Sequence, residues 1–232
     1  MTENNISENP GFDMEAFCLK CGILSPALFI EAASRLYELL VEANKTCNLT
    51  RINNIPDYWN KHIADSLFIS VFFPEIAHEE LSLADIGCGA GFPSLPLAIA
   101  FPNLEITAID STGKKTAFVE MVKNELGLKN LTVLQARACE LNRREDYGNR
   151  FDIITARAVS SAADIYRETA AMLRKKGEII LYKTPEKVQQ EKEEVSKISS
   201  KYGMKWKTSA PFELPAGNGN RIFLYSISKT GF

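Results

Sequence analysis

The stretch Leu81-Ser82-Leu83-Ala84-Asp85-Ile86-Gly87-Cys88-Gly89-Ala90-Gly91-Phe92-Pro93 decides the fold of this chain. A short apolar run ends at an acid, three glycines follow at alternate positions, and the apolar residues 95–101 can then form a helix. Glycine suits a backbone that turns with positive φ or approaches a ligand closely. A helix that starts behind such a turn points unpaired N–H groups at it. The stretch therefore predicts a strand, a tight turn and a helix, with a nucleotide-like cofactor at the turn.

Downstream of the turn, segments rich in β-branched and aliphatic residues alternate with segments of helical periodicity. The expected strands are residues 81–86, 104–110, 131–134, 151–156, 178–183 and 221–228. The expected helices between them are residues 114–126, 162–174 and 185–202. This alternation indicates βαβ crossovers and an α/β fold with a mostly parallel sheet. A late strand within residues 203–210, followed by a loop over 211–220, predicts an antiparallel hairpin at one edge of the sheet.

The part of the chain before the turn has a helical pattern. Ser25 and Pro26 suit the start of a helix. An apolar stripe at spacings of three and four is then expected to face the core, and its members are Leu28, Ala32, Leu36, Leu39, Leu40 and Ala43. A further helix is expected over residues 57–72. We therefore predict an all-helical subdomain over residues 1–75 and a cofactor-binding domain over residues 76–232.

The composition is that of an ordinary globular protein, with 45% hydrophobic and 24% charged residues. A net charge of −2 does not indicate a nucleic-acid-binding protein, so such binding would need a local basic face. Without a basic and apolar signal segment or a run long enough to span a membrane, the expected location is the cytoplasm. Cys18 and Cys21 have CxxC spacing, but no further ligands complete the set, so we expect structural cysteines and no metal site.

The glycine spacing and two acids narrow the choice of cofactor. Dinucleotide turns usually follow the pattern G-x-G-x-x-G, and ATP-binding loops carry a lysine after the last glycine. Here Gly87, Gly89 and Gly91 give G-x-G-x-G, which favours S-adenosylmethionine (SAM), a cofactor without phosphate. Asp85 ends the first strand within reach of a ligand amine or its water. Asp110 ends the next strand, where an acid is placed to accept both ribose hydroxyls.

Five motifs follow one another along the chain: Asn48-Leu49-Thr50, Lys61-His62-Ile63-Ala64-Asp65-Ser66-Leu67, residues 85–96, Asp110-Ser111-Thr112-Gly113-Lys114-Lys115 and Thr155-Ala156-Arg157-Ala158-Val159. In this order they resemble the RsmG (GidB) family of bacterial SAM-dependent methyltransferases, which modify N7 of a guanine in 16S rRNA. The resemblance covers the whole chain, from the helical start to the last strand. It implies a Rossmann-like methyltransferase fold with a seven-stranded sheet and an antiparallel edge strand.

The resemblance also implies roles for individual residues in cofactor binding. Gly87 and Phe92 would line the SAM pocket, with Gly89 and Gly91 giving backbone room. The ribose would lie beside Asp110, Ser111 and Thr112; the adenine would lie between Ala138 and Cys139; and Arg157 would close the site near the guanine. The sequence departs from the family pattern at Cys139, where an acidic or polar residue is expected, and more mildly at Ser94 and Lys183-Thr184.

The implied reaction needs few catalytic groups, because guanine N7 has an in-plane lone pair and no proton to remove. We therefore expect catalysis to rest on positioning, with Arg157 as the one candidate that touches the reacting groups. His62 and Asp65, three positions apart on one helical face, either line the cleft or only orient their helix. Expected contacts to the RNA are His62 and the basic residues Arg51, Lys61, Lys114, Lys115, Lys183 and Arg221.

The sequence is compatible with several hypotheses about the function of the protein. The leading one is a monomeric methyltransferase that acts on 16S rRNA or on the small ribosomal subunit. A SAM-dependent methyltransferase with a small-molecule acceptor, a nicotinamide-dependent oxidoreductase and a non-catalytic RNA-binding module are the alternatives. The charge run that includes Glu191 to Glu194 is expected to be a solvated helix face.

Overall fold

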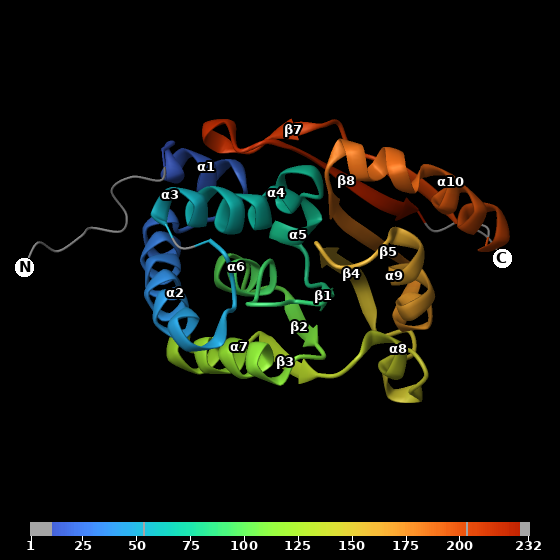
Figure 1. Ribbon diagram of the computed structural model, residues 1–232, viewed down its shortest axis with the longest axis horizontal. Coiled ribbons are helices and arrows are strands. Elements are labelled where there is room, and N and C mark those ends of the chain that lie inside the picture. Colours follow the sequence, from blue (N-terminus) through green and yellow to red (C-terminus); the bar gives the residue numbers. More distant parts are fainter. Residues whose placement is uncertain (1–10, 53, 203, 228–232) are drawn as a thin grey trace, which may run out of the picture.

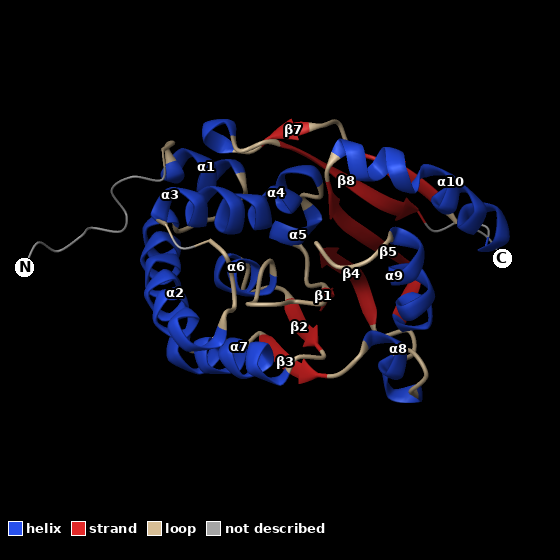
Figure 2. Ribbon diagram, viewed as in Figure 1, coloured by secondary structure: helices blue, strands red, loops and turns tan. Residues whose placement is uncertain are grey.

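The computed structural model describes residues 11–52, 54–202 and 204–227. Within these ranges one mixed sheet forms the centre of the molecule, and helices cover both of its faces (Figures 1 and 2). Some predictions fall outside the described residues, namely those on residues 1–10, Gly203 and Ser228.

Eight strands form the sheet in the described part of the chain. They are β1 Ser82–Ile86, β2 Glu105–Asp110, β3 Leu131–Gln135, β4 Phe151–Arg157, β5 Leu173–Lys183, β6 Lys205–Thr208, β7 Phe212–Glu213 and β8 Asn220–Ile227. The strand order is β3-β2-β1-β4-β5-β8-β6, and the two-residue β7 pairs with β8. Strands β1 to β5 pair in parallel, whereas β8 runs antiparallel to β5, β6 and β7.

The predicted α/β class with a mostly parallel sheet is confirmed, with corrections near the end of the chain. The predicted antiparallel hairpin at one edge is confirmed, because β6 pairs antiparallel with β8. The antiparallel strand β8 is, however, one place in from the edge, and the two-residue β7 is an eighth strand beyond the seven expected. The expected loop over residues 211–220 contains β7. Strand β5 begins at Leu173 rather than at residue 178, so the helix predicted over 162–174 ends at Thr169. The exposed Arg174, Lys175 and Lys176 in this part of β5 gave no apolar signal for a strand.

The helices alternate with the strands as the sequence indicates. They are α1 Met14–Lys20, α2 Pro26–Cys47, α3 Ile55–Asp57, α4 Asp65–Phe72, α5 Glu75–His78, α6 Ser94–Ala100, α7 Gly113–Leu126, α8 Ala138–Leu141, α9 Ala162–Thr169 and α10 Pro185–Tyr202. A π-helical turn over Tyr58–Ala64 connects α3 to α4, so residues 55–72 form one continuous helix. π-helical turns are rare in proteins, and those that occur are often found at functional sites.

The apolar stripe predicted for α2 is correct in period and wrong in part of its register. The buried residues are Phe29, Ala33, Leu36 and Leu40. Leu28 is instead 67% exposed. The helix is thus rotated by about one position relative to the expectation at its N-terminal end, because the aromatic side chain of Phe29 takes the core position.

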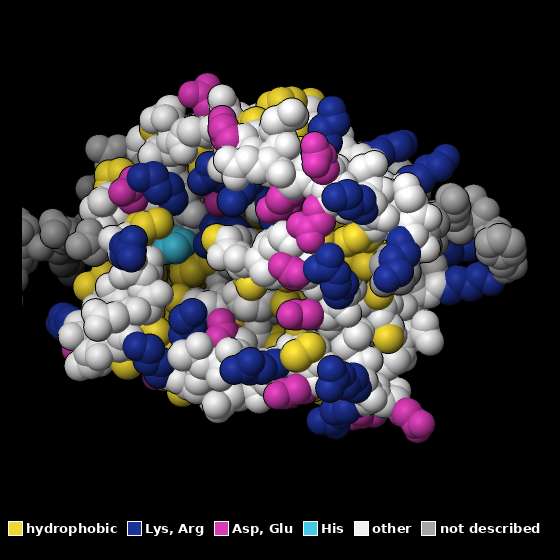
Figure 3. All heavy atoms as spheres, turned by 45° about the vertical axis from the view of Figure 1, so that its right-hand side comes forward, with side chains coloured by type: hydrophobic (Ala, Val, Ile, Leu, Met, Phe, Trp, Pro, Cys, Tyr) yellow, Lys and Arg dark blue, Asp and Glu magenta, His cyan; other side chains and the backbone are white. Residues whose placement is uncertain are grey.

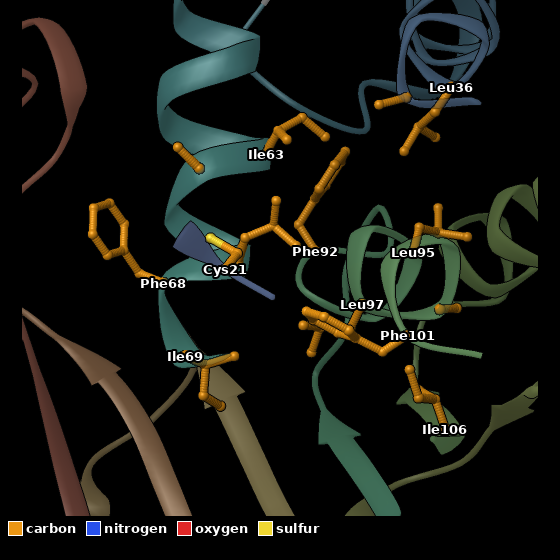
Figure 4. Packing of buried hydrophobic residues seen from close by; sticks show 14 of the residues in the cluster. Cys21, Leu36, Ile63, Phe68, Ile69, Phe92, Leu95, Leu97, Phe101 and Ile106 are labelled. Carbon is orange, nitrogen blue, oxygen red and sulfur yellow. The ribbon is translucent and has the colours of Figure 1, made fainter. Parts of the chain in front are cut away.

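Two hydrophobic cores lie on the two faces of the sheet. Alternate residues of a strand point to opposite faces; accordingly Leu83 packs with α2, α4, α6 and α7, whereas Ala84 and Ile86 pack with α8, α9 and α10. Figure 4 shows Ile63 and Phe92 pointing toward one another in the first core. The helices before residue 75 therefore share a core with the sheet, and the domain boundary at residue 75 stays a prediction.

The topology brings the ends of several strands to one edge. In parallel strands the carboxyl ends meet at the same edge of the sheet, where α/β proteins bind ligands. Strands β2, β4 and β5 end there at Asp110, Arg157 and Lys183. Strand β8 runs the opposite way and therefore begins there, next to Arg221. The glycine turn follows β1 at the same edge.

Candidate cofactor and substrate site

The glycine turn is fastened to the end of β2 by backbone hydrogen bonds. Gly87, Gly89 and Gly91 have φ values of 69°, 59° and 87°, which L-residues with a side chain rarely adopt. The N–H groups of Gly87 and Cys88 donate to the Ile109 carbonyl oxygen at 2.7 and 3.0 Å. These hydrogen bonds hold the turn against the carboxyl end of β2.

The three glycines of the turn have different surroundings. Gly87 lies in the wall of both cavities described below, and Gly89 lies in the wall of the larger one. A Cβ on Gly89 would meet nothing closer than 3.9 Å, whereas a Cβ on Gly91 would lie 2.4 Å from Leu95 Cδ1. Gly87 and Gly89 therefore leave space for a ligand at the cavity walls, and Gly91 lets α6 pack against the turn.

Asp85 lies beneath the turn and not in the wall of either cavity. Its Oδ2 accepts hydrogen bonds from the Ser94 hydroxyl and, at 3.2 Å, from the Ser94 N–H. Burial raises the pKa of this carboxyl to about 6. The other oxygen, Oδ1, is buried and has no hydrogen-bond partner in the described structure. Ser94, which departs from the family pattern, thus orients the acid, and Oδ1 can accept one more hydrogen bond.

A smaller cavity of about 490 Å³ brings together five of the predicted cofactor-binding residues, namely Asp110, Ser111, Thr112, Ala138 and Cys139. The Asp110 carboxylate accepts hydrogen bonds from Gly89 N–H at 3.0 Å and from Thr112 N–H at 2.8 Å. Lys115 Nζ lies 3.8 Å from Asp110 Oδ2. Because a carboxylate has about four acceptor positions, Asp110 retains capacity for a ligand hydroxyl.

A larger cavity of about 900 Å³ lies on the other side of Gly87. Its wall includes the predicted residues Gly89, Phe92, Lys61, His62, Lys115, Arg157, Lys183 and Arg221. Figure 3 shows a hollowed face with many Lys and Arg side chains around it. The two cavities share Gly87, Lys115, Ala158 and Val159, and so form one groove divided near the glycine turn.

A buried ionic cluster lies in the wall of the larger cavity. Arg157 donates from Nη1 to the Lys61 carbonyl oxygen at 2.8 Å, in the π-helical turn, and to Asp65 Oδ2 at 3.0 Å. Arg221 Nε lies 3.3 Å from Asp65 Oδ1, an ion pair without the alignment of a hydrogen bond. The Arg157 and Asp65 side chains are 14% and 5% exposed. The cluster therefore connects the helical part of the chain to β4 and to β8.

His62 is held in one tautomer by its neighbours. Its Nδ1 lies 3.2 Å from Arg157 Nη2, and because a guanidinium only donates, Nδ1 accepts. The proton is therefore on Nε2, which lies 3.1 Å from Thr50 Oγ1. The ring stacks on Phe92 with centroids 4.0 Å apart. Burial, followed by the positive charge of Arg157, lowers the pKa of His62 to about 3. His62 is thus a neutral residue that orients Arg157.

The lowered pKa of His62 predicts an acid-sensitive contribution to stability. In the unfolded chain a histidine has a pKa near 6.5, so below that pH the unfolded state binds a proton that folded His62 excludes. This contribution is fully present above pH 6.5 and is lost as the pH falls toward about 3. We expect the free energy of unfolding to fall by up to about 1.4 kcal/mol per pH unit between pH 6 and 4 for this one group.

Urea unfolding at several pH values, compared between wild type and His62→Gln, measures this contribution. Asp85 titrates in both proteins, so it cancels in the difference. The exposed His78 provides the matched control, and His78→Gln should keep the wild-type slope. Equal slopes for wild type and His62→Gln would contradict a buried neutral histidine.

The basic residues predicted to contact RNA lie in different situations. Arg51 and Lys114 are exposed but lie outside the walls of both cavities. Lys61 lies at the rim of the larger cavity and pairs with Asp57 at 2.7 Å. Lys183 and Arg221 are engaged by carboxylates of the protein, at Glu191 and Asp65 respectively.

Several residues of the larger cavity had no role in the sequence interpretation, among them Thr50, Val159 and Tyr182, and Glu191 was expected to face solvent. Thr50 and Val159 lie in the motifs that resemble the family, but neither side-chain type indicated a role in binding or catalysis. Glu191 is 9% exposed, so the expectation of a solvated face is wrong at this position. A signal was present, because Glu191 follows Val188 and precedes Val195 and Ile198 at spacings of three, four and three.

The CxxC pair is buried in the first core. The side chains of Cys18 and Cys21 are free thiols with exposures of 0% and 1%. Burial raises the pKa of both thiols to about 12, so they are protonated and pack as apolar side chains. Among the described residues, no group of three or more His, Cys, Asp or Glu is arranged to hold a metal ion.

The parallel sheet, the glycine turn and the acid at the end of β2 define the fold of the SAM-dependent methyltransferases. A SAM-dependent methyltransferase from Aquifex aeolicus shares this fold, with a TM-score of 0.50 and 22% identity over 67% of this chain and 87% of that one. A ribosomal protein L11 methylase from Lactobacillus delbrueckii subsp. bulgaricus has a TM-score of 0.52 and 15% identity over 72% and 79%.

The chain belongs to the GidB family, described as rRNA small subunit methyltransferase G, whose family model matches residues 29–211. A ribosomal RNA small subunit methyltransferase G from Lactococcus lactis is 37% identical over 200 residues, which are 86% of this chain and 83% of the relative. One from Limosilactobacillus reuteri is 40% identical over 173 residues, 73% and 72% of the two chains. The predicted family, fold and cofactor are therefore confirmed.

Proposed function

We propose that this protein transfers a methyl group from SAM to N7 of a guanine in the 16S rRNA of the small ribosomal subunit. The observation that carries the proposal is the divided groove, which has a nucleoside-sized cavity on one side of Gly87 and a cavity rimmed by basic side chains on the other. The relatives named rRNA small subunit methyltransferase G support the choice of substrate.

The residues of the smaller cavity fit the nucleoside end of the cofactor. Asp110 would accept the ribose hydroxyls with its remaining acceptor positions, beside Ser111 and Thr112. Ala138 and Cys139 would flank the adenine. The open space above Gly89 supports a close approach of the ligand to the turn. The free acceptor on Asp85 Oδ1 suits a water molecule beneath the amino-acid end.

The chemistry of the proposed acceptor agrees with the side chains of the larger cavity. When bound, SAM supplies an electrophilic methyl group. Guanine N7 needs no base, and His62 is not available as one, because its Nδ1 accepts from Arg157 and its pKa is about 3. The contribution of the chain is therefore to hold the acceptor in line and to exclude water. Such positioning can supply about 7–11 kcal/mol in favourable reactions.

The proposed RNA contacts are with phosphates at the rim of the larger cavity. Lys61 and Lys115 lie in the cavity wall, and Arg51 and Lys114 are exposed nearby in sequence. Lysine and arginine bind phosphates without reading sequence. Of the predicted RNA-binding residues, His62, Lys183 and Arg221 are best assigned to positioning, since each contacts another protein side chain and is less exposed than Lys61 and Lys115.

We further propose that the protein acts as a monomer in the cytoplasm. The residues proposed to bind SAM and the RNA phosphates lie in or near the walls of the two cavities of this chain, so the proposed reaction needs no residue from a second copy. The helices in the described ranges include none with the length and apolar character required to span a bilayer.

The proposed function predicts one modified nucleoside. Small subunits from cells that lack this protein are incubated with methyl-labelled SAM and the purified protein, and the digested rRNA is analysed by mass spectrometry. We expect one 7-methylguanosine per subunit. RNA with 7-deazaguanosine at the target position should accept no methyl group, because it lacks the N7 lone pair.

The outcome separates the acceptor from the cofactor. SAM binding measured by calorimetry together with an unlabelled small-subunit rRNA would contradict the substrate but keep the cofactor. Label in a nucleoside other than 7-methylguanosine would contradict the N7 assignment.

A further inference from the structure

The segment after β4 crosses the groove between the two cavities. We call residues 158–161 the strap. Ala158 and Val159 lie in the walls of both cavities, next to Gly87. A Cβ built on Gly87 would lie 2.7 Å from Val159 Cγ2, so the Val159 side chain rests directly on the glycine turn. At 50% exposure it is one of the few large hydrophobic side chains that the described structure leaves open. Val159 therefore separates the two cavities.

A buried ion pair holds the far end of the strap. Lys183 Nζ donates to the Ser160 carbonyl oxygen at 3.0 Å and pairs with Glu191 Oε1 at 2.9 Å. Glu191 Oε2 accepts from the N–H of Ala162, the first residue of α9, at 2.9 Å. We call Lys183 and Glu191 the clip. Both oxygens of Glu191 are thus used within the protein, on the backbone and the lysine that border the strap.

The surroundings of the clip argue against a role in contacting RNA. Both side chains are only 10% exposed. Glu191 occupies a position in the apolar stripe of α10 and faces the protein. Desolvation of a buried pair offsets much of its attraction, so such a pair is weak support for stability. The Lys183–Glu191 pair instead fixes the position of the strap. Within the strap, Ala158 has a φ of 55°, which L-residues rarely adopt.

The shape of the cofactor implies that the strap has to move when SAM binds. SAM is elongated, with its nucleoside and amino-acid ends on opposite sides of the sulfur. If it lies across Gly87, as the proposed function requires, SAM can pass into both cavities only while Val159 is lifted from the turn, and the strap then closes again over the bound cofactor. Motion of the strap would therefore precede both entry and release of the cofactor.

We propose that Glu191, acting through Lys183, is a positioning residue that holds the strap closed, and that the strap with Val159 is the gate through which SAM enters and leaves the groove. The proposal rests on the proposed placement of the cofactor. It assigns to Lys183 and Glu191 a role in cofactor exchange.

The gate predicts a change in rates with little change in affinity. Glu191→Gln keeps the shape of the side chain and removes the charge that holds Lys183. We expect its association and dissociation rates for SAM each to rise about tenfold, with Kd within about threefold, because the gate opens for both directions. Stopped-flow displacement of a fluorescent SAM analogue measures both rates. Glu193→Gln, an exposed acid on the same helix, is the matched control and should keep the wild-type rates.

Two further variants separate the gate from the alternatives. Val159→Ala leaves the clip intact and shortens the side chain on Gly87, so it should raise both rates to a similar degree. Lys183→Met should match Glu191→Gln, and the double variant should be no faster than either, because both remove one shared contact.

Other results of these experiments would contradict the gate. A direct role in RNA binding would make Lys183→Met weaken rRNA binding with unchanged SAM rates, and Glu191→Gln would tighten rRNA binding. That result would overturn the gate. Unchanged rates in Glu191→Gln and Val159→Ala would also overturn it, while wild-type SAM binding would leave the proposed function standing. Failure of the wild-type protein to bind SAM would instead remove the proposed function itself.

Discussion

Gly87→Val is expected to bind SAM at least about 100-fold more weakly than wild type, a loss of about 2.8 kcal/mol of binding free energy. Two effects cause the loss. With φ at 69°, a β-branched residue at this position is strained. Its Cβ would also lie 2.7 Å from Val159 Cγ2, and its methyl groups would project where the two cavities meet. Calorimetric titration with SAM measures the affinity.

Gly127→Val is the matched control for this effect. Gly127 ends α7 with a φ of 65°, and a Cβ on it would meet nothing within 4 Å. The control variant therefore carries the same backbone strain without an added group in the groove. We expect it to be destabilised in thermal unfolding but to bind SAM as wild type does. If Gly87→Val bound SAM as tightly as Gly127→Val, the cofactor would not lie across Gly87.

Arg157→Ala is expected to lower the free energy of unfolding by about 3 kcal/mol, since removal of one partner leaves a buried charge uncompensated. The variant deprives Asp65 Oδ2 and the Lys61 carbonyl oxygen of their donor. Arg221 still pairs with Asp65 Oδ1, which limits the loss. We also expect methyl transfer to be lost, because Arg157 holds the helical part of the chain against β4. Urea unfolding and single-turnover methylation measure the two effects.

Three controls define the cause of the Arg157 effect. Arg167→Ala breaks exposed pairs with Asp164 and Glu194, and should cost less than about 1 kcal/mol. Arg157→Lys should recover little, because an ammonium does not reproduce the fork of donors. Replacement of both charges, as in the double variant Arg157→Met with Asp65→Leu, should recover part of the stability without activity, because Arg221 then loses its partner Asp65. Full activity in that double variant would show that the cluster only stabilises the fold.

Residues whose place depends on local chain pattern could be predicted from the sequence. A strand that ends in an acid before alternate glycines specifies the turn by itself. Asp110 follows from the same rule, since the carboxyl ends of parallel strands meet at one edge. Arg157 ends β4 at that edge, where the family resemblance places it. Ala138 and Cys139, which come just after β3, lie in the smaller cavity, where the family resemblance places them.

Residues whose role depends on distant partners could not be predicted. His62 is a neutral acceptor only because Arg157, 95 positions away, donates to it. Lys183 has a basic side chain at a strand end, as an RNA-binding residue would, but its position is set by Glu191 and Ser160. A single sequence shows that a charge is present, whereas its partner is determined by tertiary packing.

The place of β8 in the sheet also bears on how the protein is made. It is the last strand described, yet it lies between β5 and β6, and β6 pairs with it. During synthesis, β6 therefore leaves the ribosome before its partner strand exists. Arg221, which pairs with Asp65, arrives at the same late moment. A nascent chain can thus form the glycine turn early, but it cannot complete the substrate side of the groove until β8 has been added.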